Sequence, residues 1–324
     1  MNEKKILLTN QYTGEPLRIA TEAVPEGFGI MMPAAATQEA LEELAPEADY
    51  ILAGGRLKIT AALLDRAVKL KMVQRSGVGL DALDLEALRQ RGIPLYVNQG
   101  VNAQSVAEHA LLLMLASLRR LPVIDRNTKA GVWKKQEQGI RTAELGGKTV
   151  GLIGMGHIAR TLVGLLKPFR VEILYTNLFR EAPEYERENN MRFVGLDELL
   201  AASDVVSVHC ALTDETRNLI SAEKIRGMKD GAVLVNTARG EIVDPAAVAD
   251  ALRSGKLSFA GLDVHGTEPV PEDYPLKDLE NVILTPHIAG VTADSFRAMM
   301  AAAFRNIACF DRGGLAEIED CRYL

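Results

Sequence analysis

The sequence predicts an α/β protein built from two doubly wound, mostly parallel sheets. Short apolar runs alternate with segments of helical period along nearly the whole chain, a rhythm typical of βαβ units. The series starts twice, once near the N-terminus and again near Lys148. A chain of 324 residues is also too long for one ordinary domain and comfortable for two. We expect residues 1–100 with 290–324 to form one domain and residues 101–289 to form the other.

In the first series, four apolar runs are predicted strands, and three segments between them are predicted helices. The strands are KILLT (5–9), DYILAG (49–54), KMVQRSG (71–77) and PLYVN (94–98). The helices are TQEALEELA (37–45), TAALLDRAV (60–68) and LDLEALRQRG (83–92). A long helix then runs from about Ser105 to Leu121. Because it is apolar on most faces, we expect it to be buried between domains or between subunits.

The second series contains six predicted strands, enough for a complete doubly wound nucleotide-binding domain. They are KTVGLIG (148–154), VEILYT (171–176), VVSVHC (205–210), AVLVNTA (232–238), SFAGLDV (258–264) and NVILTP (281–286). The predicted helices include DELLAAS (197–203), SAEKIRGM (221–228) and DPAAVADALRSG (244–255), and residues 179–190 are predicted to be a charged surface loop. A final helix at 292–310 has no strand left to serve, so we expect it to pack on the first domain.

Composition and charge exclude several classes of function. The net charge of −6 and the lack of a basic stripe disfavour nucleic-acid binding. Cys210, Cys309 and Cys321 are odd in number and lack ligand spacing, which disfavours a disulfide framework or a metal site. The N-terminus has no apolar signal core, and the longest apolar stretch, residues 110–118, is too short to span a bilayer. We therefore expect a cytoplasmic enzyme or binding protein with no metal and no membrane partner.

The stretch GLIGMGHIAR, residues 151–160, fits the pattern G-x-G-x-x-G/A with Gly154, Gly156 and Ala159. It lies between a predicted strand and a predicted helix, which is the context that a dinucleotide site requires. Gly154 permits the tight turn, Gly156 lets the backbone approach a pyrophosphate, and Ala159 lets the helix pack near the strand. The helix N-terminus offers free N–H groups to that anion. The alternative is a glycine-rich turn that binds nothing.

The end of the next strand, ILYTNLFR, bears on the choice of cofactor. An NAD site usually places Asp or Glu about 20 residues after the first glycine. Here that point is occupied by Thr176 and Asn177, and the first carboxylate is Glu181. The missing acid removes an objection to the 2′-phosphate of NADP, and Arg180 could pair with it. The prediction therefore leans towards NADP(H); alternatively, Arg180 is a solvated loop residue and Thr176 binds the ribose of NAD.

Three stretches that end predicted strands carry chemically useful side chains. They are residues 233–244, 260–269 and 284–290, which contribute Arg239, Glu268 and His287. Open parallel sheets bind their ligands at this edge. Reduction of a 2-keto acid needs a cation to hold the carboxylate and polarise the carbonyl, and an acid to protonate the carbonyl oxygen. A carboxylate beside the imidazole favours its charged form. Each residue alone could be structural, but their joint occurrence favours a site.

Several motifs occur in the same order as in one known family. They are SGVGLDALD (76–84), NAQSVAEHALLLML (102–115), the glycine loop, VSVHCALTDETRNLI (206–220), NTARG, LDVHGTEP and TPHIAG. Through them nearly the whole chain resembles the D-isomer-specific 2-hydroxyacid dehydrogenases, which include phosphoglycerate, glyoxylate/hydroxypyruvate and D-lactate dehydrogenases or reductases. The resemblance implies a Rossmann cofactor domain, a flavodoxin-like substrate domain and a homodimer. It also implies reversible, NAD(P)-dependent reduction of a 2-keto acid to a D-2-hydroxy acid.

The resemblance assigns roles to individual residues. Arg239, Glu268 and His287 match the catalytic residues of the family. The substrate carboxylate is expected on the backbone of Gly77, Val78 and Gly79 and on Arg239, since glycine exposes its amide to an anion. The predicted cofactor residues include those of the glycine loop and of the end of the next strand. The full set is Ser105, Gly154, Gly156, His157, Ile158, Thr176, Asn177, Arg180, His209, Cys210, Ala211, Thr237, Ala238, Asp263, His287 and Gly290. Asp263 is expected at the nicotinamide amide, and residues 209–211 beside the adenosine.

The sequence departs from the family pattern at positions that leave the catalytic groups intact. Ala82 replaces a common asparagine, Ala211 a frequent proline, and Ala159 the third glycine of the loop. His265 stands where phenylalanine is common, and we expect it to be a solvent-facing loop residue rather than a titrating neighbour of the site. Trp133 is expected to fill a core rather than to line the site from a partner subunit. Thr176-Asn177 resembles the NADP-using glyoxylate/hydroxypyruvate branch.

Two other classes of function stay open at this point. Some relatives of this fold are nucleotide-sensing binding proteins, such as corepressors, and these can retain the catalytic residues. Against that class, the chain has no added tail or low-complexity arm for recruiting partners. The other alternative is a dehydrogenase of an unusual donor: phosphite stays possible, whereas Glu268 argues against formate. The sequence does not identify the side chain of the substrate.

Overall fold

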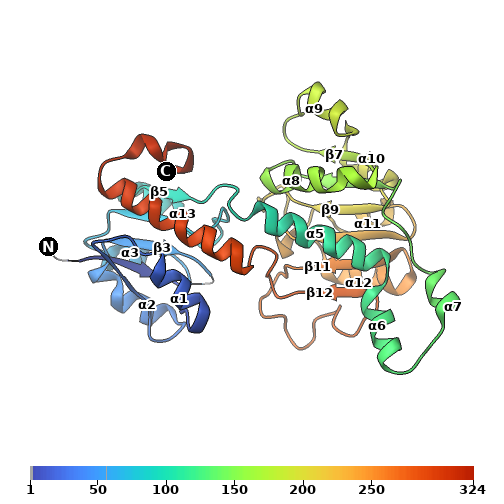
Figure 1. Cartoon of the computed structure of the whole chain (residues 1–324), viewed down its shortest axis with the longest axis horizontal. Helices are drawn as coiled ribbons and strands as arrows, with labels where there is room; N and C mark the ends of the chain where they lie inside the picture. Colours follow the sequence, from blue (N-terminus) through green and yellow to red (C-terminus); the bar gives the residue numbers. More distant parts are fainter. Residues whose placement is uncertain (1–2, 56) are drawn as a thin grey trace. The chain divides into compact units, whose positions relative to one another are not determined.

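The computed structural model describes residues 3–55 and 57–324, which form two compact units (Figure 1). One unit runs to Asn102 and resumes at Val291–Leu324, so that it contains both the blue and the red ends of the chain. The second unit is Ala103–Gly290. Each unit is built on one sheet whose paired strands run parallel. The two doubly wound parallel sheets predicted from the sequence are thus confirmed.

The sheet of the first unit has the strand order β2-β1-β3-β4-β5, the flavodoxin-like order that was expected. Its strands are β1 (Lys4–Leu8), β2 (Phe28–Met31), β3 (Tyr50–Ala53), β4 (Met72–Arg75) and β5 (Leu95–Val97). Strand β2 was not predicted. It is a four-residue edge strand that contains a glycine and is only partly buried throughout, so it lacks the apolar run that marks β3.

Helices α1 (Gly14–Glu22), α2 (Gln38–Leu44), α3 (Ala61–Arg66) and α4 (Leu85–Gln90) connect these strands. Side chains of Thr37, Thr60 and Asp84 accept backbone N–H groups at the starts of α2, α3 and α4. The last long helix, α13 (Ala293–Asp311), begins with a capping box of Thr292 and Ser295. It packs against α1 and β4 and so belongs to the first unit.

The sheet of the second unit has the order β12-β11-β10-β9-β6-β7-β8. Its strands are β6 (Thr149–Ile153), β7 (Glu172–Thr176), β8 (Met191–Phe193), β9 (Val205–Val208), β10 (Ala232–Asn236), β11 (Leu257–Leu262) and β12 (Val282–Leu284). This is the predicted Rossmann arrangement with one strand more than expected. Strand β8 escaped prediction because it is a three-residue edge strand with one exposed position. The strand order reverses between β6 and β9, where such sheets bind nucleotides.

Helices α8 (His157–Leu166), α10 (Leu196–Ala202), α11 (Ala222–Gly227) and α12 (Pro245–Ser254) connect the strands of the second unit. The predicted loop at residues 179–190 is partly wrong, because it contains the short helix α9 (Pro183–Glu188). Pro183 is tolerated in the first turn, where its missing N–H has no intrahelical partner to lose. Glu186 on this helix is buried, although its segment is strongly charged.

Helix α5 (Ala103–Leu118) packs against α8, β10 and β11 inside the second unit. Figure 1 shows it lying next to α8 over the sheet. Its buried side chains, which include Leu113 and Met114, join the core cluster formed with β6 and α8. Burial within the unit therefore accounts for much of its apolar composition, but Leu112 is 53% exposed, so the expected burial between domains or subunits stays a prediction. In the described part of the chain, no helix combines the length and apolar character that crossing a membrane requires.

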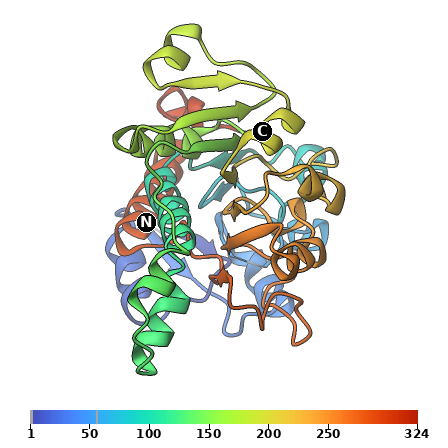
Figure 2. The same cartoon turned by 90° about the vertical axis from the view of Figure 1, so that its right-hand side faces the viewer.

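Helices α6 (Leu121–Lys129) and α7 (Lys135–Gly139) form an arm that contains no buried residue within either helix (Figures 1 and 2). Trp133, between the two helices, is 81% exposed, so the expectation that it fills a core is wrong. Leu121 and Ile140 are exposed as well. The described residues of the chain do not cover these apolar groups, which accounts for the failed core prediction.

Candidate active site

The three predicted catalytic residues follow neighbouring strands of the second unit. Arg239 comes after β10, Glu268 after β11 and His287 after β12. Strand β11 pairs with β10 on one side and with β12 on the other, and all three run parallel. The loops that carry these side chains therefore leave the same carboxyl edge of one sheet.

His287 and Glu268 form a direct pair. His287 Nδ1 lies 2.9 Å from Glu268 Oε2 and 3.2 Å from Oε1. A carboxylate only accepts hydrogen bonds, so Nδ1 carries the proton in this contact. The His287 side chain is 45% exposed, whereas that of Glu268 is 21% exposed. Nδ1 is thus committed to Glu268, and Nε2 is the ring nitrogen left to exchange a proton with a ligand.

The backbone of His287 adopts an unusual conformation that its neighbours hold in place. Its φ of 58° lies in the left-handed region, which is costly for a residue other than glycine. Its N–H donates to the carbonyls of Asp263, at 2.7 Å, and Thr285, at 3.0 Å. The fully buried Asp263 carboxylate accepts Thr285 Oγ1, Ile288 N and Ala289 N at 2.6, 3.0 and 2.9 Å. Asp263 therefore fixes the loop that carries His287, and its expected bond to nicotinamide stays a prediction.

The loop of Arg239 is organised by a buried asparagine. Asn236 donates through Nδ2 to the Arg239 carbonyl at 2.8 Å and accepts Ala238 N at 3.0 Å. The partly buried guanidinium donates through Nη1 to the Ala238 carbonyl at 2.7 Å. A Cβ on Gly240 would overlap the backbone of His265, so only glycine lets this loop approach the one that leads to Glu268. The sequence analysis missed both Asn236 and Gly240.

The glycine loop has the geometry of a phosphate cradle. Gly154 has a φ of 95°, and a Cβ there would lie 2.6 Å from Cys210 N, so the turn requires glycine on both grounds. Gly156 begins helix α8 with no side-chain cap, and the space where its Cβ would stand is open. Ala159 is fully buried against the sheet. The first N–H groups of α8 are thus available to an anion that approaches over Gly156.

Two further features fit a bound dinucleotide. Thr237 Oγ1, two residues before Arg239, is buried and has no hydrogen-bond partner among the described residues. A buried hydroxyl without a partner is costly, and a polar ligand atom would satisfy it. Burial lowers the pKa of His209 to about 4 and raises the pKa of Cys210 to about 11. Both side chains are therefore neutral near pH 7, as suits the adenosine side of a cofactor.

The remaining predicted cofactor residues lie in the same unit. Ser105 on α5 donates through Oγ to the Ala289 carbonyl at 2.7 Å and so ties α5 to the loop after His287. Ala211 is exposed, and its carbonyl accepts Thr216 Oγ1 at 2.7 Å. His157 is exposed, and Ile158, Ala238 and Gly290 are half-buried. These positions leave their proposed cofactor contacts open to test.

Arg180 is engaged by a carboxylate that the sequence analysis did not consider. Its Nε and Nη2 donate to Glu186 Oε1 and Oε2 at 2.9 and 2.7 Å. Tyr175 also donates to Glu186 Oε1, at 2.6 Å. These hydrogen bonds, that of Arg180 first, lower the pKa of Glu186 to about 2. The fork expected to bind a 2′-phosphate is thus already paired, while Thr176 and Asn177 are half-buried at the end of β7.

The predicted carboxylate-binding turn, Gly77–Gly79, lies in the first unit after β4. Val78 is exposed, and the space next to the Gly77 Cα is open. Arg75 Nε donates to the Gly79 carbonyl at 2.7 Å, and Arg75 Nη1 donates to the Ala53 carbonyl at 3.2 Å. The sequence analysis missed Arg75, although a cation at the end of a buried strand was a usable signal.

His265 is not the solvent-facing loop residue that was expected. It is only 7% exposed, and its ring nitrogens meet the Tyr274 hydroxyl at 3.2 Å and the Thr285 carbonyl at 3.0 Å. The segment after Glu268 returns over the ring, and the buried Tyr274 packs edge-on against it. The sequence could not show this burial, because it depends on a residue nine positions away.

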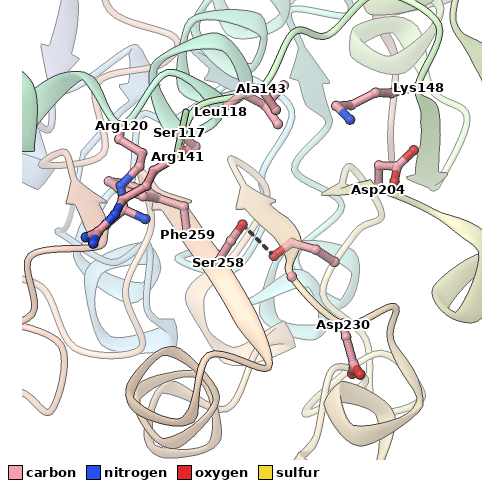
Figure 3. Close-up of a pocket in the computed structure, with 12 residues that line it drawn as sticks. Ser117, Leu118, Arg120, Arg141, Ala143, Lys148, Asp204, Asp230, Ser258 and Phe259 are labelled. Atoms are coloured by element: carbon pink, nitrogen blue, oxygen red, sulfur yellow. Dashed lines mark hydrogen bonds between the residues drawn. The ribbon is translucent and has the colours of Figure 1, made fainter. Parts of the chain in front are cut away.

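A cavity of about 200 Å³ lies at the other end of the sheet (Figure 3). Its lining includes Lys148, Asp204 and Asp230, which precede β6, β9 and β10, together with Arg120 and Arg141. None of the predicted site residues lines it, so it is separate from the candidate active site. Across residues 3–55 and 57–324, no group of three or more His, Cys, Asp and Glu side chains is placed to hold a metal ion.

Comparison with known proteins places this geometry in context. A family model described as "D-isomer specific 2-hydroxyacid dehydrogenase, NAD binding domain" matches residues 111–289, which include the glycine loop and all three catalytic candidates. A D-3-phosphoglycerate dehydrogenase of Archaeoglobus fulgidus is 38% identical over 270 residues, which cover 83% of this chain and 50% of that protein. The chain thus spans about half the length of that relative.

Two other matches cover more of the compared protein. A glyoxylate reductase of Thermofilum pendens is 40% identical over 258 residues, covering 79% of this chain and 76% of that protein. The solved structure of D-lactate dehydrogenase from Aquifex aeolicus, complexed with NAD and lactic acid, superposes with a TM-score of 0.86. It is 29% identical, and the match covers 98% of each chain.

Proposed function

The chain belongs to the D-isomer-specific 2-hydroxyacid dehydrogenase family, and on that premise we propose that it transfers hydride reversibly between a nicotinamide cofactor and a 2-keto acid. The product of reduction is a D-2-hydroxy acid. The observation that carries the proposal is the His287–Glu268 pair, which leaves the same sheet edge as Arg239 in a unit that also holds the α8 cradle. The names of the relatives support substrates of the glyoxylate, hydroxypyruvate or phosphoglycerate type.

The protein residues divide the work of reduction among them. Gly156 and the first N–H groups of α8 would hold the pyrophosphate of a bound dinucleotide, whose nicotinamide would supply the hydride. Arg239 binds the substrate carboxylate and polarises the carbonyl. His287 delivers a proton from Nε2 to the carbonyl oxygen, while Glu268 holds Nδ1 and stabilises the imidazolium. In the direction of oxidation, the same imidazole removes the hydroxyl proton.

The alternatives raised by the sequence have less support. The matched curated relatives are named as dehydrogenases and reductases of hydroxy or keto acids, which does not favour a nucleotide-sensing, corepressor-like protein. An unusual donor such as phosphite is likewise not favoured by these names.

The proposal is tested by following absorbance at the reduced-nicotinamide band with NADH and NADPH in parallel. Glyoxylate, hydroxypyruvate, pyruvate, phosphohydroxypyruvate and bulkier 2-keto acids would each be offered. We expect oxidation of the cofactor that depends on at least one of these acids. Tight cofactor binding without turnover on any of them would instead favour the sensing or unusual-donor alternatives.

Glu268→Gln is expected to move the pH–rate profile of reduction towards lower pH. The amide keeps the shape of the side chain but removes the negative charge that stabilises the His287 imidazolium. The protonated ring is the form that donates the proton in reduction. In the variant, the rate of reduction should therefore begin to fall at a lower pH than in the wild type. Reduction rates measured from pH 5 to pH 9 would show the shift, and a profile that superposes on the wild type would argue against the pair.

The proposed preference between NAD(H) and NADP(H) depends on how Arg180 is partnered. The family match supports NAD(H), and a preference for NADP(H) is the finer proposal. Because Arg180 is paired with Glu186, a 2′-phosphate would have to compete with that carboxylate for the guanidinium. Glu186→Gln keeps an acceptor for Tyr175 and weakens the ion pair. We expect it to lower the KM for NADPH several-fold and to leave the KM for NADH nearly unchanged.

A matched variant completes this test. Arg180→Ala is expected to raise the KM for NADPH without a comparable change for NADH. If both variants leave the ratio of the two KM values at the wild-type level, the 2′-phosphate site is not built on Arg180. In that case Arg180 is a structural partner of Glu186, and the ribose contacts of Thr176 and Asn177 decide the cofactor.

Three finer assignments complete the proposal. The turn Gly77–Gly79 offers backbone amides to a carboxylate, as the exposed Val78 and the open space beside Gly77 allow. The arm of α6 and α7 supports a homodimer, because Trp133 and Ile140 expose large apolar side chains that a second copy could cover. A cytoplasmic location stays a proposal from the sequence alone.

A further inference from the structure

His265 is in contact with the loops of all three catalytic candidates. Its backbone meets Gly240, directly after Arg239, where a Cβ would overlap it. Its N–H donates to Glu268 Oε1 at 3.0 Å. Its ring nitrogen Nε2 meets the carbonyl of Thr285, two residues before His287, at 3.0 Å.

The hydrogen-bond partners identify which nitrogen carries the proton. A carbonyl only accepts, so Nε2 must be the donor to Thr285. Tyr274 Oη lies 3.2 Å from Nδ1, and burial raises the pKa of Tyr274 to about 12, which keeps its hydroxyl protonated. The hydroxyl can therefore donate to a bare Nδ1. The geometry fits a neutral His265 ring in the Nε2–H form, with Tyr274 as the group that selects it.

The Thr285 carbonyl links this ring to His287. It accepts both His265 Nε2 and the backbone N–H of His287, each at 3.0 Å. His287 sits at a φ of 58°, which its surroundings must enforce. The hydrogen bond from the buried imidazole fixes the orientation of the Thr285 carbonyl. The carbonyl is thereby kept in place to accept the N–H of His287. His265 thus acts on His287 through Thr285 and on Glu268 through its own N–H.

We propose that His265 is a positioning residue for the Glu268–His287 pair, acting through the hydrogen bond from its Nε2 to the Thr285 carbonyl. The proposal rests on the proposed function in treating that pair as the proton-transfer machinery. It adds a specific requirement, an N–H donor at the position of Nε2. Phenylalanine, common at this position in the family, fills the same space without that donor.

Three substitutions separate the donor from the volume of the ring. His265→Phe keeps an aromatic ring and removes both polar contacts. His265→Gln can place an amide N–H near the position of Nε2, whereas His265→Asn can place one only near Nδ1. We expect the Phe and Asn variants to have a kcat about fivefold to tenfold below wild type, the effect of one lost hydrogen bond. The Gln variant should keep most of the wild-type kcat. The dissociation constant of the cofactor should stay within about twofold of wild type, because the expected change concerns proton transfer rather than binding.

Two outcomes would overturn the proposal. One is a kcat of His265→Phe equal to that of the wild type. The other is a kcat of His265→Gln no higher than that of His265→Asn. A residue with a merely structural role would lower the melting temperature of these variants without changing kcat per folded molecule. Thermal melting and cofactor titration on the same samples give that comparison.

A second readout does not depend on turnover. The chain has five histidines, so ¹⁵N-histidine spectra are simple enough to assign by substitution. We expect the signals of His265 to show the Nε2–H tautomer, and the signals of His287 to shift in the Phe variant but not in the Gln variant. An Nδ1–H tautomer for His265, or an unmoved His287 in all variants, would refute the positioning role. If the wild type turned over no 2-keto acid, the proposed function would fail, but the spectra would still test the contact between His265 Nε2 and the Thr285 carbonyl.

Tyr274→Phe removes the hydroxyl that selects the tautomer. It is expected to reduce kcat by a smaller factor than His265→Phe and to add Nδ1–H character to the His265 spectrum. Tyr50→Phe is a matched control, because Tyr50 is also a buried tyrosine with one side-chain partner, Asp311, but lies in the first unit. The control should leave kcat unchanged. Equal effects of the two variants on kcat would contradict the specific role of Tyr274.

Discussion

Replacing His287 with alanine is expected to lower the turnover number about a thousandfold, within the range that general acid–base groups contribute. Without the imidazole, no described side chain paired to Glu268 can deliver a proton to the carbonyl oxygen. The helix start at α8 and the glycine loop are untouched, so cofactor affinity should remain nearly intact. Steady-state rates on the best 2-keto acid, with cofactor binding followed by fluorescence, give both quantities.

His287→Gln provides the comparison for this result. Glutamine can keep a hydrogen bond to Glu268 but cannot act as an acid near neutral pH, so its turnover should be as low as that of the alanine variant. A turnover close to wild type in either variant would remove His287 from the mechanism. A parallel loss of cofactor binding would instead indicate that the loop after β12 had been disturbed.

Replacing Arg239 with alanine is expected to reduce kcat/KM for the 2-keto acid by about three orders of magnitude. The guanidinium is proposed to hold the carboxylate and to polarise the carbonyl, so its loss affects both the ground state and the transition state. Arg239→Lys should recover little, because an ammonium group cannot reproduce the planar fork. The effect should fall mainly on the keto acid and leave the dissociation constant of the cofactor within a small factor.

A surface arginine of the same unit serves as control for this prediction. Arg226 lies exposed on α11, and Arg226→Ala should leave kcat/KM unchanged. If Arg239→Lys retained most of the activity, a point charge would be sufficient and the two-pronged contact would be wrong. If Arg239→Ala retained it, another cation would have to bind the substrate carboxylate.

The alternation of strands and helices carried most of the fold prediction. Parallel strands buried on both faces form continuous apolar runs, and those runs located β1, β3, β6 and β10 directly. The short edge strands β2 and β8 were missed, since partial exposure and chain lengths of three or four residues leave no such run. Local pattern also failed for Trp133, because what covers a side chain is decided by the rest of the molecule.

The candidate site was predictable where function imposes residue types at the ends of strands. Arg239, Glu268 and His287 were named from that logic, and the structure brings His287 and Glu268 into contact. The supporting contacts were not predictable. Gly240 is needed because the His265 backbone, 25 positions later, approaches it, and no turn pattern signals such a contact.

The ion pair of Arg180 shows the same limit at the cofactor end. Arg180 was named from the sequence as a cation after β7, but its partner Glu186 lies on helix α9, which the charged sequence did not predict. A charged side chain that the sequence suggests for a ligand can instead be paired with another side chain of the folded protein. The competition between Glu186 and a 2′-phosphate for the Arg180 guanidinium could therefore be recognised only from the structure.

The central claim is tested most directly by the stereochemistry of the product. Pyruvate and hydroxypyruvate would be reduced to completion with the preferred cofactor, and the 2-hydroxy acids resolved on a chiral column. The account predicts the D-enantiomer alone, formed in equal amount to the cofactor oxidised, and formed about a thousandfold more slowly by the His287→Ala variant. L-enantiomer, a racemic product, or cofactor oxidation without a hydroxy acid would contradict it.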